Sequence, residues 1–333
     1  MEANPEDWSV DPFTFLRKDG YFYGRGTLDD KDEAAIAVAN FIKLKQEGYI
    51  PHRDIIIALT ADEEGGPVNG VVHLLAEHRN LIDAAFVINE GGGGGIFDGK
   101  PLINSVQAAE KVYQSYTLEV TNPGGHSSLP REDNAIYDLV QGLLNLQQYK
   151  FPVQFNEVSR AYFRQTAATL PQAQADHINA ILVNPEDKKA EAALSKEPGF
   201  NARMRTTCVA TQLDAGHAEN ALPQRAKATV NCRILPGVDP DSVAQTLHQV
   251  IANPKVSITP VQAPNPSPPS PLTEEVMAPI MAISEDLWPG VTVVPVMSTG
   301  ATDGLFFRQA GIPVYGVSGI MVDVNDIRAH GRD

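Results

Sequence analysis

Acidic residues follow three predicted strands of the chain, at or shortly after the point where each strand ends. In chain order they are Asp29 and Asp30, then Asp62, Glu63 and Glu64, then Glu90. Adjacent carboxylates repel one another, and closing them into a site costs more unless a proton or a cation lies between them. A single acidic stretch is equally typical of a solvated turn that caps a helix. Three such strand ends instead indicate a cation site.

The segments around these acids predict how they are positioned. Strands are predicted at 21–26, 54–61 and 84–89, and helices at 31–48 and 69–82. Strands that alternate with helices are typical of a parallel sheet covered by helices, and ligands gather at the carboxyl ends of such strands. We therefore expect the acidic strand ends to meet at one edge of a sheet. Gly91 to Gly95 lacks the Lys-Ser or Lys-Thr of a nucleotide loop, so we interpret it as a flexible turn.

The pattern of predicted secondary structure changes near residue 113, after which strands follow one another with few helices between them. Strands are predicted at 113–122, 206–216, 226–237 and 255–261, and helices at 134–148 and 241–253, with further helices within 150–200. This pattern is typical of a separate α+β module with an antiparallel sheet. The proline-rich stretch 263–272 predicts a stiff connector, after which two strands return to the first module. The predicted domains are therefore 1–112 with 263–333, and 113–262.

The composition excludes several classes of partner. The 333 residues include 41 acidic and 26 basic side chains, for a formal net charge of -15. Such a surface repels nucleic acids and anionic membranes, and no apolar run approaches the roughly 20 residues of a membrane span. The two cysteines, Cys208 and Cys232, are interpreted as small buried apolar residues, and their pairing stays open. The compartment, cytoplasmic or periplasmic/secreted, also stays open.

Seven short motifs connect these features to a known family. They are, in order, YGRGTLDDKDE, TADEEGG, VINEGGG, NPGGHSS, AENALPQ, TGATDG and RAHGRD. This ordered set resembles the M20 family of co-catalytic zinc exopeptidases and amino-acid deacylases, which includes glutamate carboxypeptidase and succinyl-diaminopimelate desuccinylase. The resemblance implies an α/β catalytic domain with a largely parallel sheet flanked by helices. It also implies an inserted α+β lid and dimerisation domain, and hence a homodimer.

The resemblance assigns the metal ligands and the general base. Asp29 resembles the carboxylate that bridges two metals, and the Asp29–Asp30 peptide bond would be cis. Glu64 and His330 resemble ligands of one metal, and Glu90 resembles a ligand of the other. Glu63 resembles the general base. The family holds two Zn²⁺ per subunit, with Co²⁺ or Mn²⁺ as alternatives.

The remaining predicted site residues belong to the lid or to a glycine-rich loop. His126 resembles the lid histidine that stabilises the oxyanion, often in the partner subunit's site. Asn220 and Arg233 resemble lid residues that contact the substrate's carboxylate, for which the guanidinium fork is suited. Gly300 resembles the start of a loop, 300–303, that lines the carboxylate pocket. By themselves, His126 is also compatible with an ordinary turn and Arg233 with a surface ion pair.

The resemblance implies a metal-dependent hydrolase. Its substrate would be a small peptide or an N-acyl amino acid, cleaved at the amide next to a free carboxylate by a dizinc-activated water, with Glu63 as base. No counterpart of the family's upstream His-x-Asp motif precedes Trp8, and the chain stops just after His330. We therefore expect a member cut at both ends, with exposed apolar edges, that holds one zinc or two weakly. The alternative is an impaired or non-catalytic dimeric carboxylate-binding relative.

Overall fold

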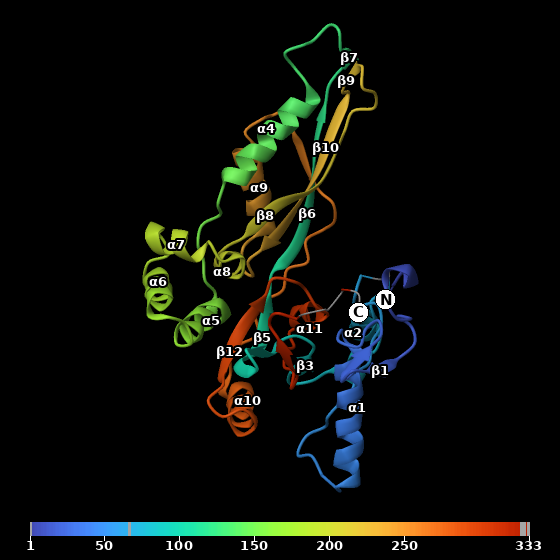
Figure 1. Ribbon diagram of the computed structural model, residues 1–333, viewed down its shortest axis with the longest axis vertical. Coiled ribbons are helices and arrows are strands. Elements are labelled where there is room, and N and C mark those ends of the chain that lie inside the picture. Colours follow the sequence, from blue (N-terminus) through green and yellow to red (C-terminus); the bar gives the residue numbers. More distant parts are fainter. Residues whose placement is uncertain (1, 66–67, 327–330, 332–333) are drawn as a thin grey trace. The chain divides into compact units, whose positions relative to one another are not determined.

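The computed structural model describes residues 2–65, 68–326 and 331, and the chain divides into two compact units (Figure 1). The first unit comprises 1–107, 272–294 and 302–333, and the second comprises 108–271 and 295–301. The sequence places the corresponding boundaries at 112/113 and 262/263. Each unit is described by itself below.

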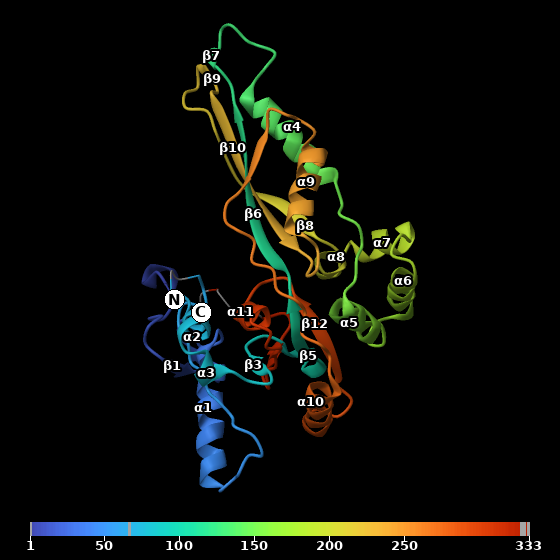
Figure 2. The same cartoon turned by 180° about the vertical axis from the view of Figure 1, so that it is seen from behind.

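The second unit is built on an antiparallel sheet with strand order β11-β6-β10-β8. Its elements are β6 (Val112–Thr121), β8 (Thr207–Ala215), β10 (Arg225–Ile234), β11 (Ser257–Pro260), α4 (Ala135–Gln148) and α9 (Pro240–Ile251). Every second side chain of β10 is buried, as expected for a strand with one face on a core. Leu139 of α4 and Leu247 of α9 pack on that face with Val230, so the two helices lie on the same side of the sheet (Figure 2).

Four short helices occupy the region between α4 and β8. They are α5 (Glu157–Ala167), α6 (Gln172–Val183), α7 (Lys188–Leu194) and α8 (Pro198–Met204). The Phe163 ring lies 5.2 Å from the Tyr162 ring and 5.6 Å from the Phe200 ring, so an aromatic cluster joins α5 to α8. The helices predicted within 150–200 are confirmed. No helix in the described part of the chain is long and apolar enough to cross a membrane.

The first unit contains most of a mixed sheet, with order β14-β4-β5-β13-β3 and with β12 also pairing β5. The strands are β3 (Val87–Asn89), β4 (Gly93–Phe97), β5 (Lys100–Glu110), β12 (Thr292–Ser298), β13 (Val314–Gly316) and β14 (Met321–Asp323). β3 pairs with β13, and β4 with β14, in parallel, whereas β4 and β5 are antiparallel. The predicted α/β class is confirmed, with antiparallel pairs in addition to the parallel ones.

Helices and a hairpin accompany this sheet. They are η1 (Pro5–Asp7), β1 (Leu16–Lys18), β2 (Tyr21–Tyr23), α1 (Lys31–Gln46), α2 (Gly70–Glu77), α3 (Arg79–Ile82), α10 (Glu274–Leu287) and α11 (Gly304–Gln309). The helix predicted at 69–82 is divided between α2 and α3, because His78 leaves the helical conformation. β2 pairs with β1 in a separate hairpin rather than joining the main sheet.

The strand predicted at 54–61 is wrong for the residues that the structure describes. The segment joins none of their sheets, and Ile55, Ile56 and Leu59 are 48%, 47% and 64% exposed. An apolar run becomes a strand only where a neighbour completes its hydrogen-bond ladder. The acids after this run are therefore not presented by a sheet edge.

The flexible turn predicted at Gly91 to Gly95 is also wrong in part, because Gly93 begins strand β4. A Cβ atom at Gly92 would lie 2.5 Å from the carbonyl oxygens of Gly316 and Ser105, and one at Gly94 would collide with Met321. The glycines therefore permit neighbouring strands to approach more closely than a side chain would allow.

The structure decides the pairing of the two cysteines, which the sequence leaves open. Cys208 and Cys232 lie opposite each other in the β8–β10 register and form a disulfide, with Cα atoms 4.0 Å apart. The partners are 24 residues apart in sequence, so the pairing depends on a strand register that spacing alone does not specify.

Candidate functional site

The first acidic pair lies in the turn between β2 and α1. The Asp29–Asp30 peptide bond is cis, as the resemblance implies. The turn begins at Gly26, whose φ of +82° suits glycine, and the Lys31 ammonium donates to the Arg25 carbonyl at 2.8 Å. Asp30 is then the N-cap residue of α1. Both aspartates are half-buried, and the Lys31 N–H donates to the Gly26 carbonyl at 3.0 Å, which closes the turn around them.

The second acidic group lies on a tight turn that begins at Asp62. Asp62 has a left-handed φ of +65°, and its carboxylate accepts the Val68 N–H at 3.3 Å. The Gly70 N–H then donates to the Ala61 carbonyl at 2.9 Å. These two bonds join the beginning of the turn to its end. The chain therefore changes direction at Asp62, and Glu63 and Glu64 lie in the turn rather than in the extended segment.

Glu63 and Glu90 form a hydrogen-bonded pair of carboxyl groups. Burial raises the pKa of Glu63 to about 7, and repulsion from Asp303 and Glu64 adds to this effect. Burial likewise raises the pKa of Glu90 to about 8, with repulsion from Glu63 and Asp30. The hydrogen bond between them favours the charged form of Glu63 and the protonated form of Glu90. Both carboxyl groups therefore bind protons more strongly than free glutamates do.

Asp30 extends this acidic cluster. Burial raises its pKa to about 7, followed by repulsion from Glu33 and Asp32 and, more weakly, from Asp29 and Glu63. The residues that act on one another in this way come from four separate segments: Asp29, Asp30, Glu63, Glu64, Glu90 and Asp303. The sequence predicts Asp303 only as part of a pocket-lining loop. Its motif, TGATDG, signals a turn but not a neighbour of Glu63.

Whether this cluster can bind a metal depends on the chemistry of its carboxyl groups. Within residues 2–65, 68–326 and 331, no group of three or more His, Cys, Asp or Glu side chains has the arrangement of a metal site. His330 lies outside the described residues. Burial, and after it repulsion between carboxyl groups, raises the pKa values of Glu90 and Asp30, and a divalent cation would reverse the repulsion. The donor set therefore fits a cation.

His126 and Asn220 lie together at one end of the second unit. His126 lies on β7 (Gly125–His126), opposite Ala221 of β9 (Ala221–Leu222), and the Asn220 carbonyl accepts the Ser127 N–H at 3.0 Å. The Ser128 N–H donates to Nδ1 of His126 at 3.2 Å. Because an N–H can only donate, the neutral imidazole carries its proton on Nε2, which is then available as a donor.

Arg233 lies at the other end of strand β10. Its guanidinium is 4.7 Å from the centre of the Tyr113 ring, and burial lowers its pKa. The strand runs from Arg225 to Ile234, and the eight residue steps from Arg225 to Arg233 span about 26 Å. Within the second unit, His126 and Asn220 are therefore close together and Arg233 is apart.

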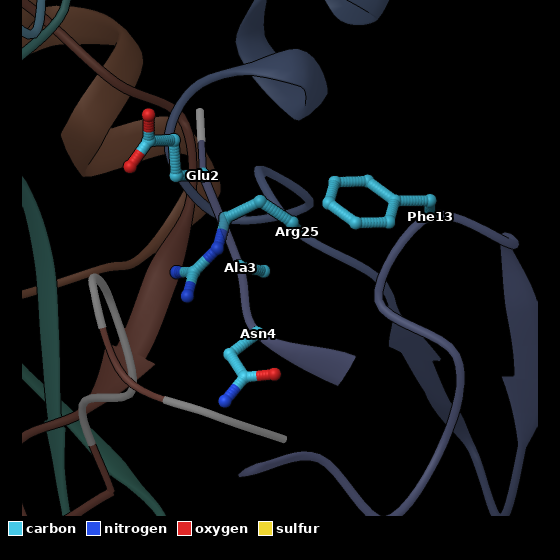
Figure 3. A pocket seen from close by; sticks show the side chains of 5 residues that line it. All are labelled: Glu2, Ala3, Asn4, Phe13 and Arg25. Carbon is cyan, nitrogen blue, oxygen red and sulfur yellow. The ribbon is translucent and has the colours of Figure 1, made fainter. Parts of the chain in front are cut away.

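Gly300 follows β12, and its N–H donates to the Ser298 hydroxyl at 3.0 Å. A separate pocket of about 610 Å³ is lined by Glu2, Ala3, Asn4, Phe13 and Arg25 (Figure 3). None of these five residues is a predicted site residue. The Arg25 guanidinium lies 4.9 Å from the Trp8 ring, so it has a local packing role.

Comparison with known proteins identifies the family. The sequence profile of peptidase family M20/M25/M40 matches residues 1–333. The chain belongs to this family. Its members are hydrolases, and solved members include metallo-carboxypeptidases, so a divalent metal is implied. The family predicted from the seven motifs is confirmed.

Two curated relatives and one solved structure show the extent of the likeness. The human N-fatty-acyl-amino acid synthase/hydrolase PM20D1 is 31% identical over 345 residues, covering 99% of this chain and 67% of that protein. A probable carboxypeptidase S-like 2 from Dictyostelium discoideum is 28% identical, covering 98% and 64%. The M20 metallo-carboxypeptidase Sso-CP2 from Sulfolobus solfataricus has a TM-score of 0.65 at 19% identity, covering 98% and 76%, and so shares the fold. The chain thus spans about two thirds of the length of its curated relatives.

Proposed function

We propose that this chain carries out metal-dependent hydrolysis of an amide bond next to a free carboxylate, with zinc as the metal. The observation that carries the proposal is the acidic cluster around Glu63, where carboxyl groups from four segments act on one another's pKa values. A cluster of this kind is unfavourable without a cation or a bound proton. Membership of a peptidase family supplies the reaction class.

The proposed roles follow from the chemistry of each side chain. Asp29, Glu64, Glu90 and His330 would hold two zinc ions. When bound, zinc polarises an amide carbonyl and lowers the pKa of water to roughly 7. Glu63 would accept a proton from the attacking water and transfer it to the leaving amine, as a general base and then a general acid.

The lid residues would bind and polarise the substrate. The His126 imidazole, with its proton on Nε2, would donate to the oxygen that gains negative charge. Arg233 would bind the free carboxylate through its two parallel N–H groups, and Asn220 and Gly300 would contribute polar contacts. Half-burial of Arg233 strengthens such a contact because water competes less for it.

The proposed substrate is an N-acyl amino acid, with a short peptide as the second choice. The two curated relatives described above support this order, since one is named for N-fatty-acyl amino acids and the other as a carboxypeptidase. Both classes present an amide bond beside a free carboxylate.

A homodimer is part of the proposal. His126 and Asn220 lie near the start of β10, and Arg233 lies about 26 Å from Arg225 along that strand. A second copy would allow the His126 end of one lid to act on substrate held by the other. Light scattering at several protein concentrations tests this, and a monomer throughout would contradict it.

The test begins with zinc per chain after dialysis against trace zinc, followed by hydrolysis of N-acyl amino acids and their carboxamide analogues. We expect bound zinc and turnover, with kcat/KM about 10- to 100-fold lower for the carboxamides, because they lose a charged hydrogen bond to Arg233. Zinc binding without turnover of acyl amino acids or dipeptides would contradict the proposal.

The alternative is a dimeric carboxylate-binding protein without turnover. It is favoured by one observation, that the described residues hold no preassembled group of three metal ligands. Calorimetry with an N-acyl amino acid would then show binding that does not depend on zinc and produces no amine.

The Cys208–Cys232 disulfide bears on the compartment. Disulfides persist in secreted and periplasmic proteins and are rare in the reducing cytosol, so we propose an oxidising compartment. Peptide mapping of the protein isolated from its native cells, without reductant, would contradict this if both thiols were free.

A further inference from the structure

The side chain of Asn69 makes three hydrogen bonds at the start of α2. Its Oδ1 accepts the Val72 N–H at 3.0 Å, which caps the helix. Its Nδ2 donates to the Asp303 carboxylate at 2.5 Å and to the Asp62 carbonyl at 3.4 Å. A capping residue needs only the first of these bonds, so the amide group has a second function.

Asp303 occupies the corresponding position in another helix. It is the N-cap residue of α11 and 5% exposed, yet its side chain makes no capping bond to α11. Its carboxylate accepts from Asn69 instead, so one hydrogen bond joins the N-cap residues of α2 and α11. The two helices also share a small apolar core, in which Val71 of α2 packs with Phe307 of α11.

The Asn69 amide bonds two groups that act on Glu63. The Asp62 carbonyl belongs to the residue before Glu63, and the Asp303 carboxylate is the charge that repels Glu63 most strongly. Close backbone packing supports this arrangement, because a Cβ atom at Gly70 would lie 2.8 Å from Thr60 and 3.0 Å from the Ala61 nitrogen. Asn69 and Gly70 therefore hold the end of this turn against its beginning.

We propose that Asn69 is a positioning residue, whose side-chain amide links the Asp62 backbone to the Asp303 carboxylate and so holds the general base Glu63 between them. The inference rests on the proposed function for the role of Glu63, whereas the link between α2 and α11 stands on the hydrogen bonds themselves. A partly buried, charge-assisted hydrogen bond is suited to this task, because it is short and strongly directional.

The variant Asn69→Asp separates positioning from capping. Aspartate caps a helix as well as asparagine does, so the bond from Val72 is kept. It cannot donate an N–H, so the link to Asp303 is lost and two carboxylates face each other. The matched control is Asn134→Asp, because Asn134 caps α4 by accepting the Ile136 N–H at 2.8 Å.

Two readouts test the proposal. In Asn69→Asp, kcat should fall about 10- to 100-fold with KM nearly unchanged, as for other residues that orient a functional side chain. Hydrogen exchange should also quicken at the Leu305 and Phe306 amides, which donate to Thr302 and Asp303 at 3.2 and 3.1 Å. Asn134→Asp should change neither. In Asn69→Asp/Asp303→Asn, where donor and acceptor are exchanged, protection at these amides should return.

The exchange readout keeps the two proposals distinguishable. If the wild-type chain hydrolyses nothing, the proposed function fails, whereas exchange at Leu305 and Phe306 still decides the link between the helices. Wild-type kcat and unchanged exchange in Asn69→Asp would overturn the inference and leave Asn69 as a helix cap alone.

Discussion

The two units differ in how they use their apolar residues. In the second unit, Leu139 and Leu247 are fully buried between the sheet and its helices. In the first unit, none of the residues of α1 is buried, and Ile42 is 54% exposed. The carboxyl groups of the acidic cluster lie in the first unit. The difference suggests that stability resides mainly in the second unit and the chemistry in the first, and the following experiments test this division.

The largest effect is expected on catalysis, from Glu63→Gln in the first unit. Glutamine cannot accept the proton from water, so kcat should fall by roughly 10²- to 10⁴-fold. Glutamine has nearly the same size and shape as glutamate, so the change leaves no cavity and the melting temperature should stay nearly unchanged. Steady-state kinetics and calorimetry measure the two quantities. The control is Glu77→Gln at the end of α2, and equal loss in both variants would contradict a specific role for Glu63.

The next effect concerns packing. Leu139→Ala should lower the free energy of unfolding by about 3 kcal/mol, because it leaves a cavity in the core of the second unit. Ile42→Ala in α1 should cost less than about 1 kcal/mol, since this side chain is more than half exposed. Urea unfolding of both variants measures the difference, and similar costs would remove the distinction between the units.

A smaller effect depends on pH and involves a buried cation of the second unit. Lys111 is 2% exposed, and its ammonium donates to the Arg205 carbonyl at 2.8 Å. Burial lowers its pKa to about 7, with repulsion from Arg233 as the next cause. Between pH 7 and 10 the unfolded chain therefore binds a proton that the folded chain does not, so this residue makes the free energy of unfolding rise with pH.

The corresponding variant is Lys111→Met. Wild-type stability should rise relative to this variant by about 1 kcal/mol per pH unit between pH 7 and 9. Urea unfolding at pH 7, 8 and 9 provides the measurement, with Lys227→Met on the exposed face of β10 as the control. A constant difference between wild type and Lys111→Met would show that Lys111 titrates normally.

The smallest effect is expected at a surface ion pair of the first unit. Arg53 lies 3.0 Å from Glu275, and both side chains are more than 60% exposed. Arg53→Ala should therefore change the free energy of unfolding by no more than about 0.5 kcal/mol, less again at high salt. A loss of several kcal/mol in urea unfolding would show that the first unit depends on this pair.

The second unit was the more predictable of the two. Helices α4 and α9 begin and end within two residues of the predicted ranges, because apolar residues recur at helical spacing and asparagine or aspartate caps the first turn. Strand β10 was equally clear, since its side chains alternate between core and surface. In the first unit the same reasoning wrongly predicted a strand at 54–61. A strand needs a neighbouring strand to pair with, and the local sequence pattern does not show whether one is present.

The sequence by itself determined the family, the α/β class and the order of the acidic motifs, because these depend on residue types and on periodicity within short segments. Tertiary structure alone decided which distant residues meet. The Glu63–Glu90 hydrogen bond, the Cys208–Cys232 disulfide and the bond from Asn69 to Asp303 each join separate segments. Such contacts depend on strand register and on the packing of helix ends, which no single segment specifies.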